Sequence, residues 1–284
     1  MPDPLIRIDA LLPSEIAHRA EEVGIKKACM DVPSMFALAV LAGAFIALGA
    51  VMATIVTAGA GGVLPYGVTR LLAGLVFCLG LILVVVGGAE LFTGNNLITM
   101  AWASRKITTG ALIRNWVIVY AGNFVGAVAT AVLLFLTRQY SFGGGVVGQA
   151  ALATANAKVN LDFVQALALG IMCNALVCLA VWLTMGARTT SDKILAIIFP
   201  ITAFVAAGFE HSVANMYFIP MGWLIRQFDP SFAASTNLDL SHLDLSGLME
   251  NLVPVTIGNI IGGAVMVAGV YWFVYLRNAR QNVP

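Results

Sequence analysis

Two glutamates and one histidine stand alone in otherwise uncharged, apolar stretches of the chain. Glu90 interrupts the stretch 71–104, and Glu210, followed directly by His211, interrupts the stretch 194–225. Ionisable side chains are costly at bilayer depth, so they face the protein interior or a water path. An imidazole also exchanges a proton near neutral pH. A lone histidine in a soluble core is usually structural, but this position after a buried glutamate favours a functional role for His211.

The two glutamates belong to one repeated motif, Gly-x-Glu-x-x-x-x-Asn, whose copies end at Asn95 and Asn215, 120 positions apart. Thr-Gly-Asn-Asn in the first copy and Gly-Phe-Glu-His-Ser in the second are poor sequences for an unbroken helix. Broken backbone is tolerated in a membrane only where it is buried or lines a cavity. We therefore expect two broken helices, whose half-length segments meet at a central site.

Glu90 and Glu210 have two possible roles. Intramembrane acids are functional candidates by default, but a carboxylate would repel an anion drawn to the electropositive ends of the half-helices. We favour a structural role for Glu90 and Glu210, together with Asn95 and Asn215. Each carboxylate is expected to accept hydrogen bonds from backbone N–H groups that its break sets free.

Composition excludes a water-soluble protein. Of 284 residues, 60% are hydrophobic and 10% are charged, and the mean hydropathy is +0.92. Soluble domains carry about 25% charged residues. A net charge of +1 gives no basic surplus for nucleic acid, and the four cysteines show no spacing typical of disulfides or zinc. We expect an all-α membrane protein without a metal or cofactor.

Six stretches, uncharged apart from Glu90 and Glu210, are long enough for the roughly 20 apolar residues of a spanning helix. They are 34–58, 71–104, 115–137, 163–187, 194–225 and 251–276. Eleven Lys and Arg residues lie on one side of these spans and four on the other, which predicts cytoplasmic termini. The expected parts are a cytoplasmic segment (1–32), a six-helix transmembrane domain (33–278) and a cytoplasmic tail (279–284). Residues 13–28 predict an interfacial helix, either a membrane-surface anchor, which we favour, or a mobile gate.

The third and sixth spans also repeat each other. Gly-x-x-x-Gly encloses Asn123 in the third and Asn259 in the sixth, 136 positions apart. Because each half contains three spans, the halves are expected to be inverted three-helix repeats. The glycine pairs favour close helix packing. The alternative is that the enclosed amides face a pore, and we retain Asn259 as a lining residue.

Three segments resemble the signatures of the formate/nitrite transporter family, and most closely its formate channels. They are 86–94, 170–180 and 208–216. The similarity runs from about residue 10 to the C-terminus. One departure is Ala175, where the family usually has a bulkier apolar residue, and with the adjacent Asn174 intact we interpret it as a packing variation. The resemblance implies an aquaporin-like fold and a homopentamer with one pore per protomer.

The resemblance also implies which residues form the pore. They are His211 and Thr93 in hydrogen-bond contact at the centre, Asn174 and Asn259 along the path, Phe77, Leu81 and Phe204 at an outer apolar narrowing, Leu91 and Val177 at an inner one, and Lys158 near the external mouth, where it would attract anions. Without the resemblance, ordinary helix packing would be the better interpretation of most of the apolar residues.

The function implied is a pH-dependent channel or transporter for formate and similar small monovalent anions in a bacterial inner membrane, not an enzyme. A bare anion loses hydration in an apolar constriction at a cost of several kcal/mol. A proton from His211 would let it cross as the neutral acid.

Other functions remain open at this point. A nitrite or hydrosulfide channel of the same family would share the His–Thr pair. An aquaporin-like pore for neutral solutes is disfavoured because Asn-Pro-Ala is absent. An intramembrane enzyme is disfavoured because no second metal ligand follows at i+4. Expected partners are the other protomers, membrane lipid and a cytoplasmic pyruvate formate-lyase.

Overall fold

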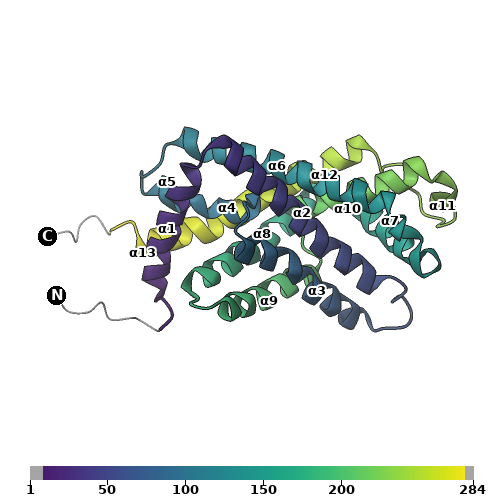
Figure 1. Cartoon of the computed structure of the whole chain (residues 1–284), viewed down its shortest axis with the longest axis horizontal. Coiled ribbons are helices and arrows are strands. Elements are labelled where there is room, and N and C mark those ends of the chain that lie inside the picture. The colour runs from purple at the N-terminus through teal and green to yellow at the C-terminus, as the bar shows by residue number, and fades with distance from the viewer. Residues whose placement is uncertain (1–8, 279–284) are drawn as a thin grey trace.

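A computed structural model describes residues 9–278, which fold into a bundle of helices (Figure 1). The first half contains α1 (Pro13–Ala28), α2 (Val32–Thr57), α3 (Tyr66–Gly87), α4 (Phe92–Asn95), the 3-10 turn η1 (Asn96–Ile98), α5 (Thr99–Ala103) and α6 (Thr109–Leu136). The second half contains η2 (Gln139–Gly145), α7 (Val146–Val159), α8 (Phe163–Gly186), α9 (Thr190–Ala207), α10 (Ser212–Phe228), α11 (Pro230–Ala234), α12 (Leu245–Ile260), the π-helical η3 (Ile261–Gly269) and α13 (Val270–Tyr275). The expected tail 279–284 and residues 1–8 of the expected N-terminal segment lie outside the described residues, and the three-part division stays a prediction.

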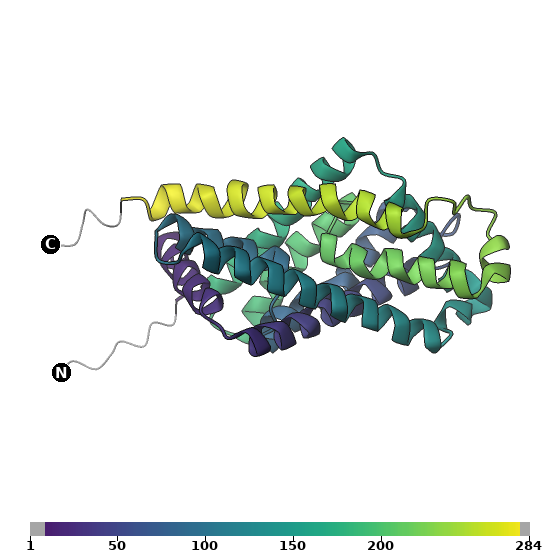
Figure 2. The same cartoon turned by 90° about the horizontal axis from the view of Figure 1, so that it is seen from above.

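Within residues 9–278, six helices are long and apolar enough to cross a membrane. They are α2, α3, α6, α8, α9 and the continuous segment from α12 to α13, which Figure 2 shows running nearly the full length of the molecule. These helices correspond to the six predicted stretches. The expectation of half-length segments at both breaks is wrong for α3, which precedes the first break. It has 22 residues, enough to cover about 30 Å at 1.5 Å per residue.

The two halves pack in the same way. α6 lies along α2, and α12 lies along α8. A Cβ atom added at Gly126 would overlap the carbonyl oxygen of Val40, and one added at Gly262 would overlap that of Ile171. The Gly-x-x-x-Gly pairs therefore serve close helix contact, as expected.

The inverted repeat extends further along the chain than predicted. α1 ends one residue after Lys27 and α7 ends one residue after Lys158. Asp31 and Asp162, four residues after Lys27 and Lys158, then cap the first turns of α2 and α8. α1 and α7 lie at opposite ends of the molecule, as inverted repeats require (Figure 1). Each repeat therefore begins with an additional helix before its first span.

The predicted interfacial helix has the expected bounds, 13–28, but its apolar face contacts protein. Ile16, Ala17 and Ala20 are buried beside Leu97 and Trp182. These contacts fix α1 against η1, α5 and α8 at the end of the bundle where α13 also lies (Figure 1).

Candidate functional site at the two helix breaks

Both predicted helix breaks are present and have the same geometry. α3 ends before Gly88, which has φ 82°, and α9 ends before Gly208, which has φ 77°. This left-handed conformation favours glycine because it has no Cβ atom. The backbone is then non-helical over 89–91 and 209–211, and helices restart at α4 and α10.

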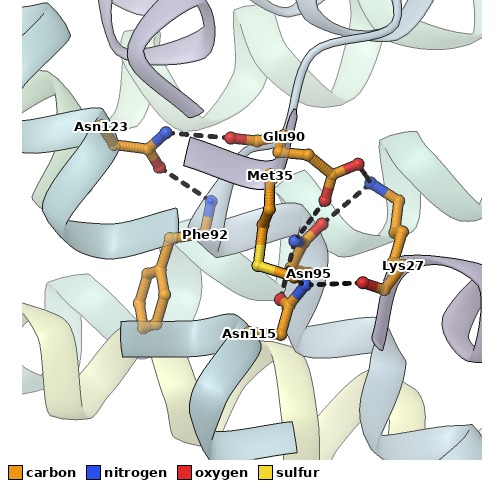
Figure 3. A network of polar contacts seen from close by, with 7 residues as sticks. All are labelled: Lys27, Met35, Glu90, Phe92, Asn95, Asn115 and Asn123. Atoms are coloured by element: carbon orange, nitrogen blue, oxygen red, sulfur yellow. Dashed lines mark hydrogen bonds and ion pairs between the residues drawn. The ribbon is translucent and has the colours of Figure 1, made fainter. Parts of the chain in front are cut away.

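One asparagine holds the backbone of the first break. The Nδ2 atom of Asn123 donates to the carbonyl oxygens of Ala39 at 2.8 Å and Glu90 at 2.9 Å. Its Oδ1 atom accepts from the backbone N–H of Phe92 at 2.9 Å (Figure 3). The side chain is fully buried, so it substitutes for the water that would otherwise satisfy the interrupted helix.

Asn259 does the same at the second break. Its Nδ2 atom donates to the carbonyl oxygens of Gly170 at 2.8 Å and Glu210 at 3.0 Å, and its Oδ1 atom accepts from the N–H of Ser212 at 3.0 Å. With both amide hydrogens and the oxygen engaged by backbone, Asn259 braces the second break, and its expected role as a lining residue stays a prediction.

Glu90 lies in a network of side-chain contacts beside the first break (Figure 3). Its carboxylate accepts from Lys27 Nζ at 2.6 Å and from Asn95 Nδ2 at 2.7 Å. The Asn95 amide also donates to Asn115 Oδ1 at 2.9 Å and accepts from Lys27 Nζ at 3.0 Å. The buried carboxylate is thus paired with an ammonium group.

The second break carries a matching network. Glu210 accepts from Lys158 Nζ at 2.8 Å and from Asn215 Nδ2 at 2.6 Å, and Asn215 Nδ2 also donates to Asn251 Oδ1 at 2.7 Å. The expectation that the carboxylates accept freed backbone N–H groups is therefore wrong at both breaks. Each asparagine brace accepts one backbone N–H, that of Phe92 or Ser212, and the N–H groups of Glu90 and Glu210 donate to the carbonyl oxygens of Leu38 and Leu169. The carboxylates accept side-chain donors instead.

The two breaks meet through one contact between their side chains. His211 Nε2 lies 3.1 Å from Thr93 Oγ1, and His211 Nδ1 accepts from the backbone N–H of Ala214 at 3.2 Å. A nitrogen that accepts carries no proton, which assigns the proton of the neutral ring to Nε2. His211 therefore donates to the Thr93 hydroxyl, and the ring of Phe204 stacks on it with centroids 5.9 Å apart.

A cavity lies on each side of this contact, and the two are named after the predicted orientation of the chain, which stays a prediction. The outer vestibule, near α7, has a volume of about 600 Å³ and reaches His211; its lining includes Phe77, Phe204, Arg70 and Lys158. The inner vestibule, near α1, has a volume of about 280 Å³, and its lining includes Leu81, Leu91, Arg19, Lys27 and Lys193. Between the vestibules, Thr93 is fully buried.

Comparison with known proteins identifies the architecture. The family model for formate/nitrite transporters matches residues 14–273. The chain belongs to the formate/nitrite transporter family. It is 46% identical to the formate channel FocA of Escherichia coli K12, over 95% of this chain and 96% of that protein. It is 43% identical to FocA of Haemophilus influenzae, over 91% and 92% of the two chains.

Solved structures agree. A structure described as a pentameric formate channel with formate bound superposes with a TM-score of 0.80 at 46% identity, covering 87% of this chain and 98% of that one. An ion channel of the same family gives a TM-score of 0.77 at 28% identity, covering 92% and 98%. This member of the formate/nitrite transporter family is therefore a multi-pass membrane protein with the family's fold.

The apolar residues expected at the narrowings fall into three groups. Phe77 and Phe204 meet edge to face in the outer vestibule, with centroids 5.6 Å apart. Leu81, expected at the outer narrowing, lines the inner vestibule with Leu91, because it follows Phe77 by four residues of α3 and so lies about 6 Å deeper. Val177 is buried and lines neither described vestibule.

Asn174, expected along the path, is buried and bonded to backbone, and its role in the path stays a prediction. Its Nδ2 atom donates to the carbonyl oxygens of Asn259 at 2.6 Å and Thr93 at 3.2 Å. One hydrogen is therefore bonded to α4, directly after the first break, and the other to the backbone of the asparagine that braces the second break. The wide turns of η3 place Gly263 directly against this amide, where a Cβ atom would overlap it.

Sequence reasoning missed Lys27, Asn115 and Asn251. Two signals could have found them. Asn115 and Asn251 each precede a bracing asparagine by eight residues, and Lys-x-x-x-Asp occurs at both 27–31 and 158–162. The two asparagines are 136 positions apart, like Asn123 and Asn259, and the two Lys-x-x-x-Asp segments are 131 positions apart.

Proposed function

We propose that this protein is a channel for formate and related small monovalent anions, with one conduction path in each protomer of a homopentamer. The observation that carries the proposal is the contact of His211 with Thr93 at the point where the outer vestibule ends. The relatives named as formate channels support the choice of substrate. Transport by this chain involves no enzymatic turnover.

The His–Thr pair offers hydrogen-bond donors to an anion that has lost its water. Nε2–H and the Thr93 hydroxyl can both turn to a carboxylate oxygen, and such charge-assisted bonds replace part of the lost hydration. Transfer of the Nε2 proton from a neutral ring would leave an imidazolate. Passage as formic acid therefore requires the ring to gain a second proton, which the Ala214 N–H opposes at Nδ1. We infer that the resting pair donates hydrogen bonds and that proton exchange occurs only at acidic pH.

The test is uptake of labelled formate, with nitrite in parallel, into vesicles at two pH values. His211→Phe is expected to abolish the pH dependence of formate flux, whereas His242→Phe, in an exposed loop, should leave it unchanged. An unaltered pH dependence in His211→Phe would remove the histidine from the mechanism. Faster nitrite than formate flux would favour the alternative of a nitrite channel, and sulfide uptake would favour a hydrosulfide channel.

We further propose a bacterial inner-membrane location with both termini in the cytoplasm. The positive-inside count supports this orientation, and α1 and α13 lie at the same end of the bundle (Figure 1). The relative described as pentameric supports the assembly, which sedimentation in detergent would test. Binding of a cytoplasmic pyruvate formate-lyase by the N-terminal segment stays a prediction.

A further inference from the structure

Two cations line the outer vestibule among the described residues, and they differ in how their charge is used. Lys158 lies 2.8 Å from Glu210, and the two side chains are 13% and 6% exposed. The opposite charges of this pair largely offset each other at distances well beyond their separation. Arg70 forms no ion pair within residues 9–278, so it supplies the net positive charge of the vestibule.

The guanidinium of Arg70 is anchored at the carboxyl end of α9. Its Nε atom donates to the carbonyl oxygen of Ala206 at 3.2 Å, and its Nη2 atom donates to that of Val205. A Cβ atom built at Gly208 would lie 3.4 Å from Nη2, so the group covers the second break. A guanidinium has five N–H groups, and those on Nη1 have no partner in the described part of the chain.

We propose that Arg70 is an anion-collecting site in the outer vestibule, where it binds a small monovalent anion before that anion reaches His211. The last carbonyls of a helix carry partial negative charge, and here they border the anion path. Arg70 covers these carbonyls and makes the electrostatic potential of this surface positive instead of negative. This inference rests on the proposed function, and it transfers to Arg70 the attraction expected of Lys158.

Arg70→Gln tests the charge. A unit charge about 6 Å away in a dielectric near 80 changes local anion concentration about threefold. We expect about a threefold rise in the half-saturating formate concentration for flux from the outer face, with unchanged maximal flux and a weaker dependence on salt. Arg138→Gln, which removes an exposed cation outside this lining, is the matched control.

Two further variants separate charge from architecture. Arg70→Lys keeps the cation and should restore most of the low-concentration flux. Tyr66→Glu places a carboxylate one helical turn from Arg70 and leaves the α9 contacts intact; Tyr66 is 78% exposed and lines the same vestibule. It should reproduce the Arg70→Gln effect even if that variant does not assemble.

The inference is overturned if Tyr66→Glu and Arg70→Gln keep wild-type half-saturation and salt dependence, or if Arg138→Gln shifts them equally. It is also overturned if maximal flux falls and Arg70→Lys does not restore it, because Arg70 would then be purely structural. Failure of the proposed function is distinguishable, since the wild-type protein would then carry no formate at all.

Discussion

Replacing Asn259 by alanine would show how much one side chain contributes to the second break. The substitution removes the side-chain oxygen that accepts from the buried Ser212 N–H, and it removes one donor from each of two carbonyl groups, those of Gly170 and Glu210. An unsatisfied buried donor costs about 1–3 kcal/mol, and each ordinary hydrogen bond contributes about 0.5–1.5 kcal/mol. We therefore expect Asn259→Ala to destabilise the protein by about 2–6 kcal/mol.

The assay is thermal unfolding of the purified protein in detergent, followed by formate flux in vesicles. A loss of this size should lower the melting temperature by about 5–20 °C. Flux should also fall, because Ser212 follows the histidine that contacts Thr93. Asn160→Ala is the matched control, since this exposed asparagine bonds only within its own turn, to Asn156.

Asn123→Ala provides an internal replicate, because the first break has the same three contacts. The melting temperatures of both variants should fall by similar amounts if the two asparagines are equivalent. A melting temperature for Asn259→Ala within about 2 °C of wild type would refute the reasoning, since the orphaned groups would then have found other partners at no cost.

Two other substitutions have calculable effects on folding. Gly126→Ala forces a methyl group against α2 and should destabilise by about 1–3 kcal/mol, whereas Gly110→Ala, with no atom within 3.7 Å of the new carbon, should melt like wild type. Glu210→Gln leaves Lys158 buried without its carboxylate and should cost about 3–5 kcal/mol, whereas Glu250→Gln, at an exposed position, should not. Thermal unfolding measures all four, and equal melting temperatures within either pair would contradict the corresponding packing or charge argument.

Much of the architecture was predictable because it follows from uncharged stretches and repeated motifs in the sequence. Uncharged stretches of sufficient length identify the spans, since a membrane tolerates few charges. The motif around Glu90 and Glu210 predicts both breaks, because glycine and asparagine are poor helix formers wherever they occur. The repetition of the motif, together with the odd number of spans in each half, predicts inversion. These are local properties, or repetitions of local properties.

Pairings across the fold were not predictable in this way. The sequence contains Lys27 and Lys158, but only the packed helices place each ammonium on a buried carboxylate. The same holds for Asn123 and Asn259. From the sequence their amides could lie at a helix contact or face a pore, and only the folded backbone of each break shows what they bind. A polar side chain joins whichever unsatisfied group lies within about 3 Å. That distance depends on how helices far apart in the chain pack, and therefore the tertiary structure decided it.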